Sequence, residues 1–190
     1  MDSNKTIVNS NKMVCLGDSI TWGYPYGPEY SWVALAETAL GTPMINKGIN
    51  GETALDLWRR FARDVISNVP SHVFIMAGTN DASIGVSLEE FKRSILQMTA
   101  GAWEKEIRPV LGLPIPSSDR FLENNLQKYR QWLTEYSETS GVLVVDFSPA
   151  MTDLSGQINY GCYNDEVHPS KAGYRAMAGV FSEFYQNVIR

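Results

Sequence analysis

Cysteine and histidine are both scarce in this sequence. Its 190 residues include two cysteines, Cys15 and Cys162, and two histidines, His72 and His168. Two cysteines cannot build the disulfide framework of a small secreted domain. The four side chains also lack the spacing of a zinc site, so no metal site is predicted. Cys15 stands inside an apolar run, which indicates a small buried hydrophobic residue.

Positive charge and long apolar runs are scarce as well. Asp and Glu number 21 against 16 for Lys and Arg, and the net charge is −5. Nucleic acids and anionic membrane surfaces both favour a basic face, so we expect neither as a partner. No apolar run approaches the length of a membrane span, and residues 1–11 lack the apolar core of a signal peptide. The sequence therefore predicts a cytoplasmic protein without stable membrane association.

Short apolar runs alternate with amphipathic segments along the chain. The runs are predicted strands, at residues 13–16, 43–46, 72–77, 109–113 and 142–145. Predicted helices lie at residues 31–40, 53–69, 88–102, 122–136 and 169–188. This alternation is typical of a parallel sheet with helices on both faces. We expect one domain, a three-layer α/β/α sandwich with a five-stranded sheet, over residues 12–190 after a polar lead-in at 1–11.

Apolar residues at helical spacing predict which face of each helix is buried. In the second predicted helix these residues are Leu55, Trp58, Ala62 and Val65. In the last predicted helix they are Met177, Phe181, Phe184 and Val188. The segments at 19–30 and 146–168 show no such pattern, and we expect them to be loops.

Ser19 directly follows the first predicted strand, in the sequence Gly17-Asp18-Ser19. A glycine lets the backbone turn sharply, so the serine hydroxyl would project from the rim of the sheet. Chemistry in open parallel sheets takes place outside the carboxyl ends of the strands, where a nucleophile is needed. A serine in such a turn can also serve only as a hydrogen-bonding turn residue, and this stretch alone does not separate the two roles.

A base and its orienting group are available at the same edge of the sheet. His168 is the candidate base for Ser19, because His72 opens a strand at the opposite end of the sheet. Asp165 precedes His168 by three residues, a spacing that allows its carboxylate to hold the imidazole through Nδ1. The plainer alternative is that Asp165 and His168 cap the last helix.

Oxyanion donors are expected on the loops that follow the first three strands. The candidates are the backbone N–H groups of Ser19 and Gly51 and the side-chain amide of Asn80, because an amide donates without carrying charge. Asn80 and Asp81 could instead form only a turn. Asp18 is expected to stabilise the turn before Ser19.

These segments together resemble the successive blocks of the SGNH, or GDSL, hydrolase family. The blocks are Gly17-Asp18-Ser19-Ile20, Gly51, Gly78-Thr79-Asn80-Asp81 and Asp165-Glu166-Val167-His168-Pro169. The resemblance implies a flavodoxin-like sandwich and ester hydrolysis without a metal or organic cofactor. It assigns Ser19 as nucleophile and first oxyanion donor, Gly51 and Asn80 as the other donors, His168 as base and Asp165 as its orienter. Gly48 competes with Gly51 for the second block, which fits Gly51 best.

The resemblance implies a serine esterase that hydrolyses small or medium carboxylic esters through an acyl-enzyme. A short-chain acyl esterase, a lysophospholipase-like enzyme and a carbohydrate O-acetyl esterase all remain open. A non-catalytic binding module on the same fold is an alternative of another class. A nucleotide or flavin binder is disfavoured, because Asp18 would repel phosphate. The expected partner is a small-molecule ester, and the oligomeric state is left open.

Aromatic residues are frequent in the loops expected to border the site. Trp22, Tyr24, Tyr26 and Tyr163 are predicted to contact substrate, with Tyr30 and Tyr160 nearby in sequence. Such a rim could bind an acyl chain or the face of a sugar, or it could be ordinary loop packing.

Overall fold

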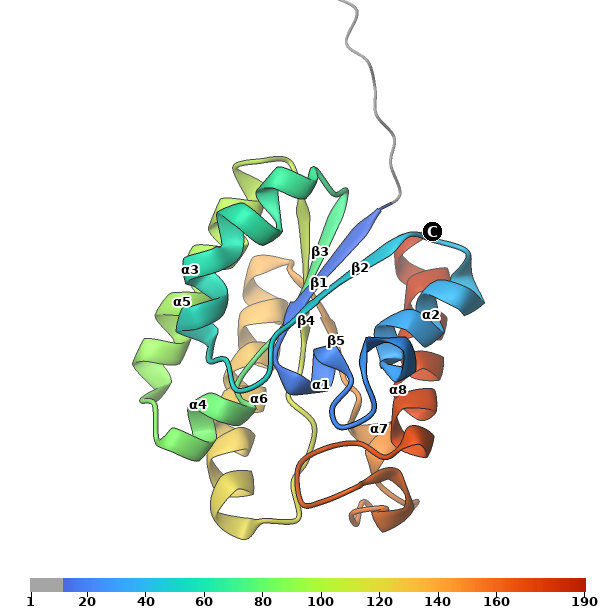
Figure 1. Cartoon of the computed structure of the whole chain (residues 1–190). Coiled ribbons are helices and arrows are strands. Elements are labelled where there is room, and N and C mark those ends of the chain that lie inside the picture. The colour runs from blue at the N-terminus through green and yellow to red at the C-terminus, as the bar shows by residue number, and fades with distance from the viewer. Residues whose placement is uncertain (1–11) are drawn as a thin grey trace, which may run out of the picture.

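Five parallel strands form the centre of the computed structural model, which describes residues 12–190 (Figure 1). The strands are β1 (Met13–Gly17), β2 (Met44–Gly48), β3 (His72–Met76), β4 (Arg108–Gly112) and β5 (Leu143–Val145). They lie in the order β2-β1-β3-β4-β5, and Cys15 of β1 is paired with Asn46 and Phe74 on its two sides. The predicted five-stranded parallel sheet is confirmed. The predicted lead-in at 1–11 lies outside the described residues.

Helices cover both faces of this sheet, as Figure 1 shows. One face carries α3 (Ala54–Asp64), α4 (Thr79–Ile84), α5 (Leu88–Trp103) and α6 (Arg120–Ser140). The other carries α2 (Trp32–Leu40), α7 (Ser148–Met151) and α8 (Lys171–Phe184). Alternate residues of β1 point to opposite faces, so Val14 packs in the first core and Cys15 in the second. The predicted α/β/α sandwich is therefore correct, and Cys15 is buried as expected.

The buried face of α3 differs from the predicted one by one residue. Leu57 and Phe61 pack inward with Arg60 and Asp64, whereas Leu55 is 44% exposed. Of the four predicted positions only Val65 is fully buried; Trp58 is partly buried, and Ala62 is exposed. The charged residues Arg60 and Asp64 lie on the inner face and interrupt its apolar pattern. The sequence pattern therefore indicates the neighbouring face as the buried one.

The predicted buried face of the last helix is also wrong in part. Met177 and Phe181 are buried and Phe184 packs partly buried against the same core, as expected, but Val188 is half exposed, whereas Tyr185 is buried and Ile189 contacts the core. The chain leaves the α-helix after Phe184 and continues as a π-helical turn over Tyr185–Ile189. The wider turn shifts the inward position away from the 3.6-residue period on which the prediction depended.

Four-residue helices account for most of what the loop predictions missed. The segment expected as a loop at 19–30 contains α1 (Ser19–Trp22) and a 3-10 turn, Pro28–Tyr30. The segment expected as a loop at 146–168 contains α7 and a second 3-10 turn, Tyr160–Cys162. A single turn is too short to show a hydrophobic period, so its sequence cannot be told from a loop.

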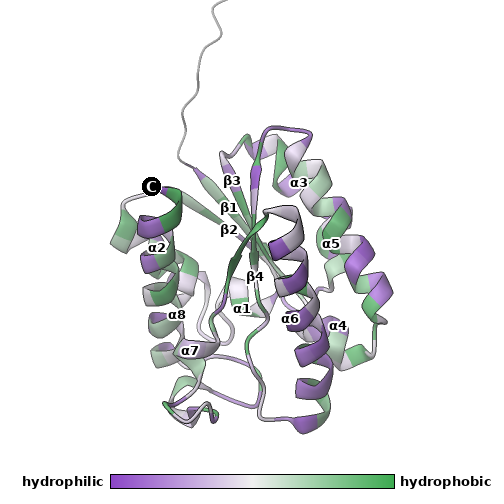
Figure 2. Ribbon diagram, turned by 180° about the vertical axis from the view of Figure 1, so that it is seen from behind, coloured by the Kyte–Doolittle hydropathy of each residue, from purple (hydrophilic) through white to green (hydrophobic). Residues whose placement is uncertain are grey.

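The distribution of hydropathy follows the layers. In Figure 2 the strands are mostly apolar, while α6 carries a hydrophilic stripe on its outer side. That arrangement is typical of a sheet buried between two amphipathic helical layers. Within residues 12–190, no helix is both long enough and apolar enough to cross a bilayer.

Candidate active site

The site lies at the carboxyl ends of β1 and β3, the neighbouring strands between which the sequence order of the sheet reverses direction. Ser19 is the first residue of α1 and is 6% exposed. Asp18 caps this helix, because its Oδ1 accepts a hydrogen bond from the Ile20 N–H at 2.9 Å. Asp18 therefore stabilises the turn, as predicted, and holds Ser19 at a fixed place on the sheet edge.

The structure brings Ser19, His168 and Asp165 into one hydrogen-bonded chain. Ser19 Oγ lies 3.1 Å from His168 Nε2. His168 Nδ1 lies 2.9 Å from Asp165 Oδ2, on the opposite edge of the ring. A carboxylate accepts only, so this contact requires a proton on Nδ1 and leaves Nε2 free to accept the serine proton.

Asp165 is held as a carboxylate by its own backbone turn. Its partial burial favours the neutral form, but Oδ1 accepts hydrogen bonds from the N–H groups of Val167 and His168, at 2.8 and 2.7 Å. Together with the imidazole contact these bonds outweigh burial, so the pKa of Asp165 is lowered from its ordinary value. The charged form is the one that can orient and stabilise a protonated imidazole.

Gly48 and Gly51 have different environments. The N–H of Gly48 donates to Asn46 Oδ1 at 2.9 Å, and a Cβ at Gly48 would meet the Trp22 backbone nitrogen at 2.2 Å. Gly48 is therefore required for close packing of β2 against α1. Gly51 has a positive φ of 82°, and nothing lies within 4 Å of the position of a Cβ. Its N–H makes no hydrogen bond among residues 12–190, so Gly51 is the one of the two with a free donor.

The Asn80 side chain is fixed against the loop that contains Gly51. Its Nδ2 donates to the Glu52 carbonyl at 2.9 Å. An amide nitrogen carries two hydrogens, so one N–H remains for another acceptor. Asp81 strengthens the same junction, because both of its carboxylate oxygens accept from the Ala54 N–H at the start of α3, with N···O distances of 3.1 Å. The loops after β2 and β3 are thus joined by two neighbouring residues.

Arg60 is a structural residue of the site that the sequence analysis missed. Its guanidinium is 6% exposed and donates to the carbonyls of Gly17 and Lys47, at 3.0 and 2.9 Å. It also forms ion pairs with Glu52 at 2.5 Å and Asp64 at 2.8 Å. These bonds connect the ends of β1 and β2 to the loop beside Gly51. The available signal was the spacing of Arg60 and Asp64 by four residues, which places both on one helix face.

Two buried carboxyl groups flank the proposed donors. Burial raises the pKa of Asp18 to about 7, against the hydrogen bond from Ile20, and the charge of Asp81 adds to the rise. Burial likewise raises the pKa of Asp81 to about 6, although the Ala54 N–H opposes it. The immediate neighbours of Ser19 and Asn80 therefore change charge near neutral pH.

The predicted aromatic residues occupy different positions. The Tyr24 ring lies 4.5 Å from the His168 ring, and the Tyr24 carbonyl accepts a hydrogen bond from the buried Tyr174 hydroxyl at 2.8 Å. Tyr26 is half-buried and donates to Asn164. Tyr163 is half-buried and donates from its hydroxyl to the Pro116 carbonyl at 2.5 Å. Trp22 ends α1 and is partly exposed. Tyr24 is the one of the four with a ring contact to a proposed catalytic side chain.

The other histidine, His72, lies away from the candidate site. His72 is the first residue of β3, at the end of the sheet away from Ser19, as expected. Burial lowers its pKa, and the nearby charge of Arg108 adds to this effect. Within residues 12–190, no three His, Cys, Asp or Glu side chains are placed to hold a metal ion.

Comparison with known proteins gives consistent matches. The model of the GDSL-like Lipase/Acylhydrolase family matches residues 15–176. An acetylxylan esterase from Geobacillus stearothermophilus is 28% identical over 161 residues, which are 75% of this chain and 71% of that protein. The uncharacterized lipoprotein YqeF of Bacillus subtilis (strain 168) is 31% identical over 142 residues, which are 68% of this chain but only 58% of that protein. Among solved structures, a G-D-S-L family protein from Desulfitobacterium hafniense DCB-2 is 34% identical, with a TM-score of 0.86 and 91% and 98% of the two chains covered.

Proposed function

The chain belongs to the GDSL-like lipase/acylhydrolase family and is a hydrolase acting on ester bonds, and from this premise we propose that Ser19, His168 and Asp165 are its catalytic triad. The observation that supports this assignment is the hydrogen-bonded chain from Ser19 Oγ through His168 to Asp165, with distances of 3.1 and 2.9 Å. We propose small or medium carboxylic esters as substrates.

The first half of the reaction forms an acyl-enzyme. Ser19 Oγ attacks the ester carbonyl while His168 Nε2 takes the hydroxyl proton, and Asp165 stabilises the imidazolium. The N–H groups of Ser19 and Gly51 and the free amide N–H of Asn80 donate to the oxyanion. When the tetrahedral intermediate collapses, the carbon–oxygen bond of the ester breaks. The departing alkoxide then receives the proton from His168.

The second half repeats these steps with water. His168 removes a proton from water, the resulting hydroxide attacks the acyl-Ser19 carbonyl, and the same donors stabilise the second oxyanion. Collapse releases the carboxylic acid and returns the proton to Ser19. The cycle uses the named side chains, the backbone N–H groups of Ser19 and Gly51, and one water molecule.

A carbohydrate O-acetyl esterase is the second candidate. It is favoured by the similarity to the acetylxylan esterase of Geobacillus stearothermophilus and by the exposed Tyr24 ring beside His168. Exposed aromatic rings can pack against the apolar face of a sugar. A lysophospholipase-like activity has no comparable support among the described contacts.

Initial rates on p-nitrophenyl esters from acetate to decanoate test the proposal. Ser19→Ala removes the nucleophile, so we expect turnover to fall to the rate without enzyme while the circular dichroism spectrum stays that of the wild type. Ser83 is an exposed serine of α4. Ser83→Ala is therefore the matched control and should retain the wild-type rates. Wild-type turnover in Ser19→Ala would refute the triad, and absence of turnover in the wild type on every ester would favour a binding module.

A further inference from the structure

The Tyr24 ring gives the proposed base a third contact. Hydrogen bonds to Ser19 and Asp165 engage the two nitrogens of the His168 ring. The centroid of the Tyr24 ring lies 4.5 Å from that of His168, with an angle of 53° between the ring planes. Two hydrogen bonds at opposite edges still allow an imidazole to tilt about the line that joins them. A second ring packed against it resists this tilt.

The backbone of Tyr24 is fixed on both sides of its Cα. Its N–H donates to the Ser19 carbonyl at 3.0 Å, and its carbonyl accepts from the Tyr174 hydroxyl at 2.8 Å. Gly23 permits the sharp turn between Ser19 and Tyr24, because its φ is 107° and a Cβ there would lie 2.4 Å from the Gly27 carbonyl oxygen. Tyr24 therefore bonds to the backbone of the proposed nucleophile and contacts the proposed base with its ring.

Tyr174 connects this arrangement to the helix that follows His168. Helix α8 begins at Lys171, on the face of the sheet opposite α3 and α4. Tyr174 is fully buried in this helix. Burial raises the pKa of its hydroxyl, so the group stays protonated and able to donate near neutral pH. The same helix thus supports His168 through the chain and Tyr24 through a hydrogen bond.

The segment that follows Tyr24 is held at the same place. Lys171 Nζ lies 4.0 Å from the centroid of the Tyr30 ring and 5.2 Å from that of the Tyr26 ring. The Tyr26 hydroxyl donates to Asn164 Oδ1 at 3.2 Å. Contacts of these kinds fix a surface segment against the element below it. The position of Tyr24 is therefore set by its neighbours and not by its own side chain.

We propose that Tyr24 is a positioning residue, whose ring holds His168 in line with Ser19. The Tyr174 hydroxyl fixes Tyr24 for this role. The inference rests on the proposed function, because it requires His168 to be the base and acid of the reaction. The role belongs to the ring, since the Tyr24 hydroxyl has no hydrogen-bond partner in the part of the chain that the structure describes. An aromatic ring is also a favourable neighbour for the imidazolium that forms during the reaction.

The test compares two acetyl esters with different leaving groups. p-Nitrophenolate departs without a proton, whereas the ethoxide of ethyl acetate must be protonated by His168. A displaced imidazole therefore slows the hydrolysis of ethyl acetate more. We expect Tyr24→Leu to lower kcat/KM about tenfold for ethyl acetate and at most about threefold for p-nitrophenyl acetate. Tyr24→Phe keeps the ring and should have the wild-type kcat/KM for both esters.

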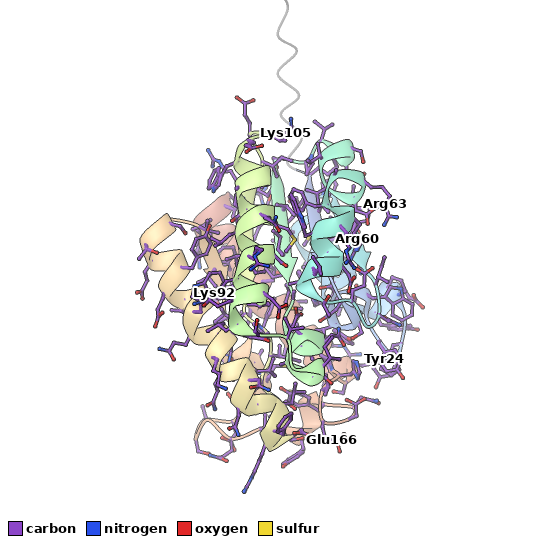
Figure 3. All side chains as sticks on the ribbon, turned by 90° about the vertical axis from the view of Figure 1, so that its left-hand side faces the viewer. Tyr24, Arg60, Arg63, Lys92, Lys105 and Glu166 are labelled. Atoms are coloured by element: carbon purple, nitrogen blue, oxygen red, sulfur yellow. The ribbon has the colours of Figure 1, made fainter. Side chains whose placement is uncertain are left out.

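Tyr174→Phe tests the hydrogen bond that fixes Tyr24. It removes one hydroxyl, so we expect the same greater loss on ethyl acetate, but a smaller one than in Tyr24→Leu. Urea unfolding checks that each variant is folded under the assay conditions. Trp103→Leu is the matched control, since Trp103 is an exposed aromatic residue at the end of α5. Figure 3 shows Tyr24 toward the end of the molecule opposite Lys105, so Trp103→Leu should leave both kcat/KM values unchanged.

The inference is overturned if Tyr24→Leu keeps the wild-type values, or if it lowers both by the same factor, as a general loss of structure would. Equal losses in Tyr24→Phe and Tyr24→Leu would also overturn it, because the hydroxyl would then act on the substrate. So would a wild type that hydrolyses only the nitrophenyl ester, since His168 would then not protonate an alkoxide. Turnover by Ser19→Ala, or no turnover of either ester by the wild type, would instead overturn the proposed function.

Discussion

Asn80 shows how one side chain can be both a structural contact and a proposed catalytic donor. One N–H of its amide is used to fix the side chain on the Glu52 carbonyl, and the other is directed by the same planar geometry. An oxyanion donor is useful only if it is held in place before the reaction begins. The bond to Glu52 provides this at the level of a single residue.

Replacing Asn80 by Ala should therefore reduce kcat by about 10²–10³ with a small effect on KM, because the lost bond matters mainly in the transition state. Steady-state rates on p-nitrophenyl acetate measure this. Asn80→Asp is the companion variant, since it keeps the shape but replaces a donor with a charged acceptor, and it should be at least as damaging. A kcat within threefold of the wild type for Asn80→Ala would contradict the role.

Much of the site at this scale could be predicted from the sequence. Ser19, Asn80 and His168 were placed at one edge because each follows or precedes an element whose end lies there. The preference for Gly51 over Gly48 as the candidate donor is explained only by the structure, in which Gly48 packs against the Trp22 backbone. The full role of Arg60 could not be predicted, because two of its four acceptors, the carbonyls of Gly17 and Lys47, belong to strands that are distant in the sequence.

At the scale of elements, α3 holds the sheet edge together. Arg60 reaches from this helix to the last residue of β1 and to β2, and its partner Glu52 lies in the loop before the helix. Hydrogen bonds from Arg63, with Arg60 adding to them, lower the pKa of Asp64 to about 2 against its partial burial. Figure 3 shows Arg63 extending from the outer side of the same helix.

Arg60→Ala should lower the free energy of unfolding by about 3–5 kcal/mol, because Asp64 and Glu52 lose their buried ion-pair partner and the carbonyls of Gly17 and Lys47 each lose a donor. Urea unfolding measures this. Arg60→Lys should recover only part of the loss, since an ammonium group cannot span the same acceptors. Arg63→Ala is the control, because Arg63 shares Asp64 but is mostly exposed. Equal effects of Arg60→Ala and Arg63→Ala would contradict this account.

The same residue explains why the predicted helix face was wrong by one position. Apolar periodicity takes account only of hydrophobic residues. It therefore does not identify a helix position where a buried guanidinium is fully hydrogen-bonded. The long helices α5 and α6 bury mostly apolar inner faces, and Ser94 and Thr99 of α5 are the buried polar residues among them.

At the scale of the whole molecule, the sheet, its two helical layers and the strand positions to within two residues followed from the alternation of apolar runs and amphipathic segments. Single turns such as α1 and α7 did not, because four residues carry too little pattern. Stability at this scale also depends on the buried carboxyl groups beside the site. Their raised pKa values make the whole fold sensitive to pH.

The sign of this dependence follows from proton binding. Between about pH 4 and pH 7 the unfolded chain has released the Asp18 proton, whereas the folded chain still binds it, so the free energy of unfolding falls as the pH rises through this window. Asp18→Asn keeps the helix cap without the charge. We expect it to be more stable than the wild type at pH 8 by about 1–4 kcal/mol, because each pKa unit corresponds to about 1.4 kcal/mol.

Thermal unfolding of both proteins at pH 4 and pH 8 measures this difference, which should nearly vanish at pH 4. Asp119→Asn is the control, since Asp119 caps α6 in the same way but on the surface. A wild type that is the more stable protein at pH 8 would show that the ionised Asp18 is tolerated without cost.

The division of the site by the sheet has an evolutionary consequence. Two of the proposed oxyanion donors, Gly51 and Asn80, lie before α3 and within α4 of one helical layer, and the proposed base His168 lies before α8 of the other. Substitutions in the loop before α8 that spare Asp165 and His168 can therefore change the surroundings of the proposed base while Gly51 and Asn80 keep their positions. A lineage with this architecture can diversify its substrates through one loop without rebuilding the machinery that breaks the bond.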